Sequence, residues 1–89
     1  MILSTTDTLN GYRIKGYCGV YHYTSYSCEP QDAINGMEKA FSDDYYNYDD
    51  DDLAIIGIKL TQLTDYEEQA DDPSYWFVAY GTGVIIEEE

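Results

Sequence analysis

Apolar residues recur along the chain with two different periods, and each period predicts a type of secondary structure. Residues 12–17 alternate apolar and polar positions, as a strand with one buried face does, and the β-prone composition continues to residue 24. Residues 2–6 are also β-prone, and Asn10-Gly11 predicts a turn between the two segments. We expect Gly16 or Gly19 to bend or bulge the longer strand.

The following apolar positions lie three and four residues apart, which predicts a helix that begins near Pro30. Proline suits the first turn, and Asp32 complements the positive end of the helix dipole. Gly36 costs about 1 kcal/mol relative to alanine, so the helix depends on tertiary contacts. Residues 49–52 are acidic and should end the helix, because negative charge opposes the dipole there. The predicted apolar face consists of Ala33, Met37, Ala40, Phe41, Tyr45 and Tyr48.

Two long apolar segments complete the chain. Residues 53–60 are apolar on both faces up to Lys59, which predicts an interior strand or one covered by another subunit. Residues 64–74 form an acidic loop, and residues 75–86 form a last strand in which Gly81 and Gly83 mark bulges or close packing. The two strands should pair as an antiparallel hairpin. The sequence therefore predicts an α+β fold in a single domain, residues 1–89, with a small antiparallel β-sheet of about four strands and one helix packed on it.

The charge is strongly negative and unevenly distributed. The 18 acids and 4 bases give a formal net charge of −14. Residues 1–28 hold one acid and two bases, a net of +1, and residues 29–89 hold seventeen acids and two bases, a net of −15. Electrostatic repulsion argues against direct binding to nucleic acid or to an anionic membrane, and favours a basic partner. A merely solvated surface is the alternative, although solubility needs a net charge of only about 2–8.

No apolar run is long enough to cross a bilayer, and no signal peptide precedes the chain. We therefore expect a cytoplasmic protein, in the host cytoplasm if a phage encodes it.

The cysteines and the histidine give little support for catalysis or zinc binding. Cys18 and Cys28 are too far apart for a CxxC motif, and His22 is the only histidine. A disulfide remains open, but two reduced thiols are the preferred interpretation. Cys18 and His22, four residues apart in a strand, should share a face but lack an orienting third group. We expect no enzyme and no cofactor.

A calcium loop is also unsupported. Asn47, Asp49 and Asp51 have the spacing that begins an EF-hand loop. Asp52 stands where the loop needs glycine, and Ile58 where it needs a bidentate glutamate. We therefore predict no metal site.

The acidic, tyrosine-rich stretch at residues 42–52 is the main candidate for function. A fixed array of carboxylates can imitate the closely spaced phosphates of DNA and occupy a basic groove. Interleaved tyrosines can order such a run or stack on arginines of the partner. The predicted partner is a basic nucleic-acid-binding protein, such as a Cas or restriction nuclease, and charge and size are similar to those of phage anti-CRISPR and anti-restriction inhibitors. The predicted partner-binding residues are Asp43, Asp44, Tyr45, Tyr46, Tyr48, Asp49, Asp50, Asp51, Asp52, Glu67, Glu68, Asp71 and Asp72.

Four segments resemble YbjQ-like proteins. Residues 2–14, with their Thr-Thr run and Gly-Tyr pair, and residues 17–20 resemble the opening of that family; residues 54–58 and 78–87 resemble its closing strands. The resemblance implies a small α+β domain in a ring-like homo-oligomer, a pentamer. The family has been labelled as heavy-metal binding, but no metal ligand can be matched here. The middle region, residues 30–52, is shorter and more acidic than in the family. An oligomeric scaffold of unknown role, with any metal association left open, is thus the alternative function.

Overall fold

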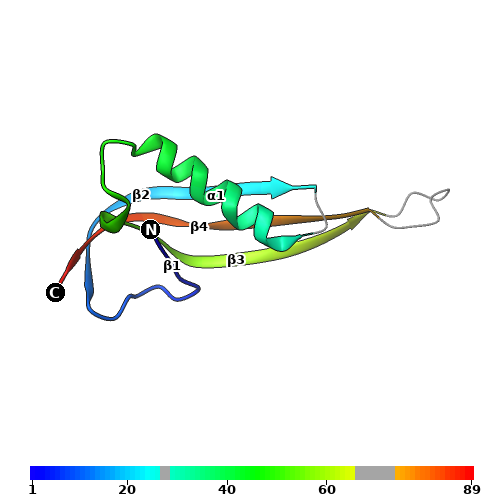
Figure 1. The fold of residues 1–89 in the computed structure, drawn as a ribbon. Coiled ribbons are helices and arrows are strands. Elements are labelled where there is room, and N and C mark those ends of the chain that lie inside the picture. Colours follow the sequence, from blue (N-terminus) through cyan, green and yellow to red (C-terminus); the bar gives the residue numbers. More distant parts are fainter. Residues whose placement is uncertain (27–28, 66–73) are drawn as a thin grey trace.

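The chain forms a four-stranded sheet with one helix packed on one of its faces (Figure 1). A computed structural model describes residues 1–26, 29–65 and 74–89. The α+β prediction with one helix is confirmed. The elements in chain order are β1 (Ile2–Leu3), β2 (Tyr12–Ser25), α1 (Pro30–Asp44), the 3-10 turn η1 (Asp50–Asp52), β3 (Leu53–Asp65) and β4 (Ser74–Glu88).

The strand order is β1-β3-β4-β2, and the sheet is mixed rather than antiparallel as predicted. β4 pairs antiparallel with β3 and with β2, which confirms the hairpin, and β3 lies between β1 and β4 along its first half. β1 instead runs parallel to β3, pairing Ile2 with Ala54. The sequence pattern could not reveal this, because the period of two is the same whether the neighbouring strand is parallel or antiparallel.

Two bulges interrupt β2, close to the predicted glycines. The pairing with β4 shifts between Ile14 and Gly16 and again between Tyr17 and Gly19, so one extra residue is inserted at each point. The second bulge places Cys18 against the core under α1. His22 alternates with Tyr21, which also packs under α1, and therefore faces the other side of the sheet. The predicted shared face of Cys18 and His22 is wrong, because a bulge reverses the alternation of side chains.

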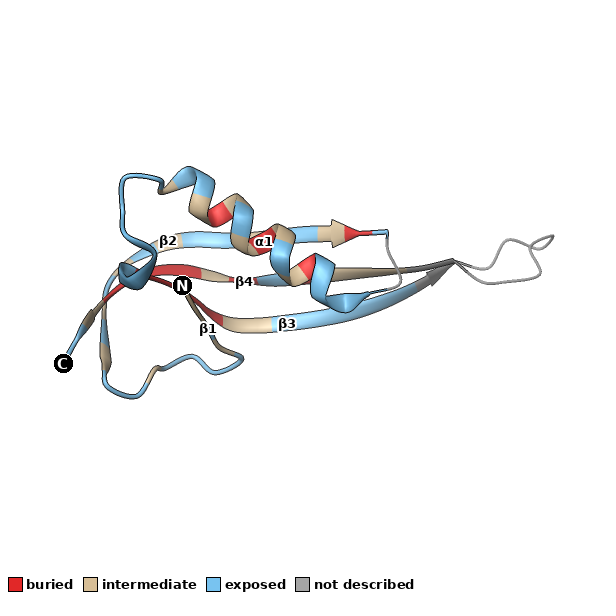
Figure 2. Ribbon diagram, in the orientation of Figure 1, coloured by how far each residue is buried: buried red, intermediate tan, exposed pale blue. Residues whose placement is uncertain are grey.

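The apolar face of α1 forms the centre of the core. Ala33, Met37 and Phe41, spaced four residues apart, are wholly buried against the sheet, where α1 packs mainly on β2 and β4. Figure 2 shows the buried bands of α1 facing the sheet. The helix begins at Pro30 as predicted, and its C-cap Tyr45 donates its N–H to the Phe41 carbonyl at 3.1 Å.

The predicted helical face extended too far along the chain. Tyr45 leaves helical geometry with φ −119° and ψ 40°, in a last turn that contains no base. Tyr48 therefore lies beyond the helix, although its ring still contacts that of Tyr45 at 5.8 Å between centroids.

The N-terminal segment covers part of the opposite face of the sheet. Ile2 and Leu9 pack there against a second buried cluster that includes Ile56 and Val84. Gly57, with φ +61°, turns its N–H to the Thr6 carbonyl at 2.9 Å, a backbone conformation that favours glycine. This bond holds the loop that follows β1 against β3. Just beyond this point, the pairing between the two strands ends.

We expect Gly83→Ala to destabilise the fold by about 1–3 kcal/mol, the usual cost of overpacking. A Cβ at Gly83 would lie 2.8 Å from Cε1 of Phe41, whose ring is wholly buried. Gly16→Ala is the matched control, since a Cβ there meets nothing within 4 Å. Urea unfolding should show a lower midpoint for the first variant only, and equal midpoints would contradict this packing.

Candidate functional site: the acidic end of the sheet

Carboxylates gather at the end of the sheet where β3 begins and β4 ends. Leu53 pairs with Ile85, so the antiparallel register brings the residues before β3 next to those that end β4. We call residues 49–52 and 87–89 the acidic end. All are exposed except Glu87, which is half-buried. Seven carboxylates from two segments distant in sequence thus share one end of the molecule.

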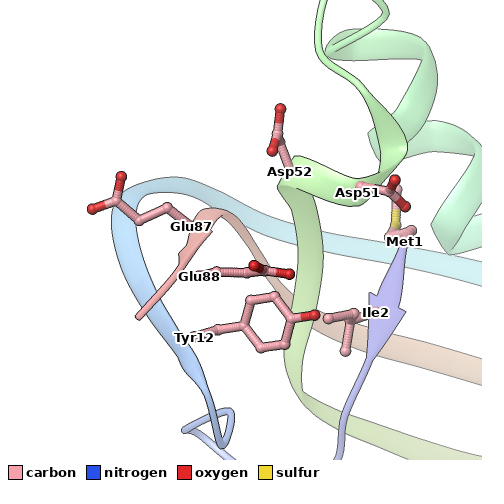
Figure 3. Close-up of a pocket in the computed structure, with 7 residues that line it drawn as sticks. All are labelled: Met1, Ile2, Tyr12, Asp51, Asp52, Glu87 and Glu88. Atoms are coloured by element: carbon pink, nitrogen blue, oxygen red, sulfur yellow. The ribbon is translucent and has the colours of Figure 1, made fainter.

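A pocket of about 460 Å³ opens within the acidic end. Four of its lining residues are acidic, namely Asp51, Asp52, Glu87 and Glu88, and the other three are Met1, Ile2 and Tyr12. Figure 3 shows the Tyr12 ring between Glu88 and Ile2, and Asp51 next to Met1. The lining combines negative charge with an aromatic and aliphatic wall, a combination suited to an amphipathic cation such as an arginine or lysine side chain.

Backbone hydrogen bonds hold both acidic segments. The Asp52 N–H donates to the Asp49 carbonyl at 2.9 Å within the η1 turn. The Glu89 N–H donates to the Gly11 carbonyl at 3.0 Å, and Glu88 is paired with Tyr12 across the sheet. The carboxylates therefore project from an ordered backbone rather than from a free tail.

Bases neutralise only one side of this end. Arg13 forms an ion pair with Glu87, and the Lys15 Nζ lies 3.6 Å from the other oxygen of that carboxylate. Within the part of the chain that the structure describes, no base forms an ion pair with Asp51, Asp52 or Glu88. The pocket therefore retains a net negative charge.

The acids at the end of α1 are engaged within the molecule instead. The Lys39 ammonium donates to Asp43 at 2.7 Å, and the Tyr21 hydroxyl donates to Asp44 at 2.7 Å. Burial, followed by the hydrogen bond to the Asp44 carboxylate, raises the pKa of Tyr21 well above its ordinary value. Asp44 thus contributes to anchoring the helix end on β2.

A row of aromatic rings continues from this anchor. Tyr21 contacts Phe41, Phe41 contacts Tyr45, and Tyr45 contacts Tyr48, with centroids 4.9, 5.2 and 5.8 Å apart. A hydrogen bond to the Cys18 thiol, together with burial, raises the pKa of Tyr45.

The structure divides the predicted binding residues into three groups. Residues 49–52 lie together and exposed at the acidic end, with Tyr46, 79% exposed, on the segment that leads to them. Asp43, Asp44, Tyr45 and Tyr48 make the internal contacts described above. The remaining four predicted residues, Glu67, Glu68, Asp71 and Asp72, lie outside the described residues, as does Cys28.

Sequence reasoning missed the contribution of Glu87, Glu88 and Tyr12 to the acidic end. The predicted hairpin contained the necessary signal. In an antiparallel hairpin the start of the first strand lies beside the end of the second, and four aspartates directly precede the first strand. The last strand was predicted to end at residue 86, whereas β4 continues to Glu88.

The described residues contain no group of three acidic, histidine or cysteine side chains placed to hold a metal ion. Cys18 is a half-buried free thiol. No helix in the described ranges is long and apolar enough to cross a membrane.

Comparison with known proteins reveals a close sequence relative. The chain is 35% identical over 91 residues to UPF0145 protein MJ1170 of Methanocaldococcus jannaschii, covering 98% of this chain and 93% of the relative. The chain belongs to the UPF0145 family. This membership confirms the YbjQ-like resemblance.

Two further comparisons add little to this assignment. The UPF0145 chain matches no family model. It is similar to a crystal structure of a DUF74-family protein of unknown function from Pediococcus pentosaceus, with 21% identity, a TM-score of 0.45 and coverage of 100% of this chain and 98% of the other.

In this UPF0145 protein we expect Tyr21→Phe to lower the free energy of unfolding by about 1 kcal/mol at pH 8, the usual effect of losing one hydrogen bond. The raised pKa of folded Tyr21 means that the unfolded chain loses this proton first as pH rises past about 10. The stability that the hydroxyl contributes is therefore complete below pH 10 and declines above it.

The test is urea unfolding of the wild type and of Tyr21→Phe at pH 8 and pH 11.5. The difference in free energy of unfolding between the two proteins should be smaller at pH 11.5. Tyr46→Phe, at an exposed position, is the control and should match the wild type at both pH values. A difference for Tyr21→Phe that stays constant would refute the coupling to Asp44.

Proposed function

We propose that this UPF0145 protein is a non-enzymatic binding protein that presents its acidic end to a basic partner. The observation that carries the proposal is the pocket that four carboxylates, from η1 and from the end of β4, line together with Tyr12. A bound arginine or lysine can place its charge among the carboxylates and its aliphatic stem against Tyr12, Met1 or Ile2.

The ordered backbone supports this function. Binding to a flexible acidic run requires that the run be ordered, and that entropy cost reduces affinity. Residues 50–52 are already held in a 3-10 turn, and Glu88 in the sheet. Association with a basic surface should then be rapid and sensitive to salt.

The most specific form of the proposal is inhibition of a basic nucleic-acid-binding protein, for which a Cas or restriction nuclease is one candidate. Its support is the density of charge alone. Successive aspartates in a 3-10 helix rise about 2 Å each, close to the spacing of about 1.7 Å between phosphate charges along the DNA axis. The UPF0145 relative carries no assigned activity in its name.

We expect a variant with Asp49→Asn, Asp50→Asn, Asp51→Asn and Asp52→Asn to bind basic probes about tenfold more weakly. Exposed ion pairs contribute about 0.2–1 kcal/mol each, so four of them together can account for about 1.4 kcal/mol. The probe is a fluorescein-labelled dodecapeptide of alternating arginine and glycine, titrated by fluorescence anisotropy at 50 and 200 mM NaCl.

A control variant removes the same number of charges elsewhere, through Asp7→Asn, Glu29→Gln, Asp32→Asn and Glu38→Gln. This variant keeps the acidic end, and its affinity for the peptide should fall by less than about threefold. Equal losses in the two variants would show that net charge, not the acidic end, determines binding. The specific form is tested by a competition assay, in which each of the two variants competes with duplex DNA for binding to purified Cas and restriction nucleases.

A second candidate function is a homo-oligomeric scaffold, and the face of the sheet opposite α1 favours it. Residues 17–26, 59–63 and 76–82 contain no acid in a chain of net charge −14. Large apolar side chains on these segments are nevertheless exposed, with Tyr17 at 73%, Val20 at 70% and Tyr80 at 38%. Here two copies could pack without bringing carboxylates together.

Val20→Glu tests the scaffold, because it places a carboxylate on the acid-free surface at an exposed position. We expect it to reduce the molar mass measured by light scattering after size exclusion, at 150 mM NaCl. Tyr46→Glu adds the same charge at an exposed position of the acidic segment and should leave the mass unchanged. A wild-type protein of monomeric mass at 100 μM would exclude this candidate.

A further inference from the structure

One edge of the sheet is only partly occupied. β1 pairs with the first half of β3, and the last bond of this pairing runs from the Ile58 N–H to the Ser4 carbonyl at 3.0 Å. β3 continues to Asp65, and its residues 59–63 are all exposed. In the described ranges 1–26, 29–65 and 74–89, no backbone pairing reaches this edge of β3 beyond Ile58.

The main-chain groups at this edge have a predictable direction. The Ile58 N–H points toward β1, and strand geometry repeats every two residues. Beyond the register shift between Ile56 and Lys59, Leu60 and Gln62 therefore turn their N–H and C=O groups to the same open edge, and those of Lys59 and Thr61 face β4. The open edge thus offers two donors and two acceptors in line with β1. These are groups that an added strand can bind.

An apolar groove lies where β1 stops. It has a volume of about 210 Å³ and is lined by Leu3, Ser4, Thr5, Gln31, Ile34 and Ile58. Its walls therefore come from the end of β1, the first turns of α1 and the edge of β3. The volume suits one aliphatic side chain. Leu60, 42% exposed, adds apolar surface next to Ile58 on the strand.

We propose that an extended segment of another protein adds to the open edge of β3, continues the line of β1 and inserts an aliphatic side chain into this groove. Main-chain bonds to Leu60 and Gln62 provide the pairing, and the groove selects the side chain. The site is separate from the acidic end, so the two proposals can fail independently.

Charge determines the kind of segment. Glu29 and Asp32 are exposed at the start of α1, next to Gln31 of the groove, and the whole chain carries −14. These carboxylates attract a segment that has aliphatic residues and flanking lysines. The occupant is therefore an apolar β-strand peptide with positive ends.

The test titrates ¹⁵N-labelled protein with the peptide acetyl-KTVTLTVK-amide and follows amide chemical shifts. We expect shifts at residues 58–62 and around Leu3, Thr5 and Ile34. Leu60→Pro removes the outward N–H at an edge position that tolerates proline, and should weaken binding at least tenfold. Leu60→Thr keeps the N–H and should bind within about threefold of the wild type.

Two altered peptides keep the test independent of how well Leu60→Pro folds. One carries N-methyl groups at alternate residues and cannot donate to the edge, and the other replaces its central leucine by serine. Both should bind at least tenfold more weakly. Equal binding of the N-methylated peptide, shifts confined to other surfaces, or no shifts at 1 mM peptide would overturn the proposal. A lower molar mass of Leu60→Pro in light scattering would also overturn it, because the occupant would then be a second copy.

Discussion

The contact between Phe41 and Gly83 determines where the helix lies on the sheet. The wholly buried ring sits where β4 has no side chain, and a Cβ at Gly83 would lie within 3 Å of it. Tyr21 and Tyr45 pack against the same ring, and the hydroxyl of Tyr21 binds Asp44, so the contact also fixes where α1 ends. The acidic segment that follows thus starts from a defined point above β2 and returns through η1 to the beginning of β3.

The register of the hairpin then builds the acidic end. Pairing of Leu53 with Ile85 brings Asp51 and Asp52 beside Glu87 and Glu88, and Tyr12 joins them from β2. Repulsion among these carboxylates opposes the arrangement, but burial of Ala54, Val84 and Ile86 just inside the same end favours it. The concentration of charge is therefore maintained by apolar packing next to it, and a basic partner would relieve the repulsion.

The rest of the surface differs in character. Residues 17–26, 59–63 and 76–82 carry no acid, and the edge of β3 past Ile58 has unpaired main-chain groups among the described residues. Natural sheets usually protect such edges with charges, bulges or proline, because an open edge invites another strand. Bulges interrupt the first half of β2, and the register of β3 shifts between Ile56 and Lys59. Residues 59–63 of β3 beyond that shift contain only Lys59 as a protective residue. The acidic end and the open edge of β3 thus differ in charge and in hydrogen-bonding groups.

The sequence by itself determined the local elements. The four-residue spacing of Ala33, Met37 and Phe41 predicted the helix, the apolar runs predicted an interior hairpin, and the glycines of β2 predicted its bulges. These features follow from the fit between side-chain period and backbone geometry, which is local. The direction of β1, the separation of Cys18 from His22 and the union of Asp51 with Glu88 were decided only by the tertiary structure. A period of two is the same for parallel and antiparallel strands, so it does not reveal strand direction. One inserted residue reverses the face on which the following side chains lie. A shared pocket depends on the register between segments more than thirty residues apart.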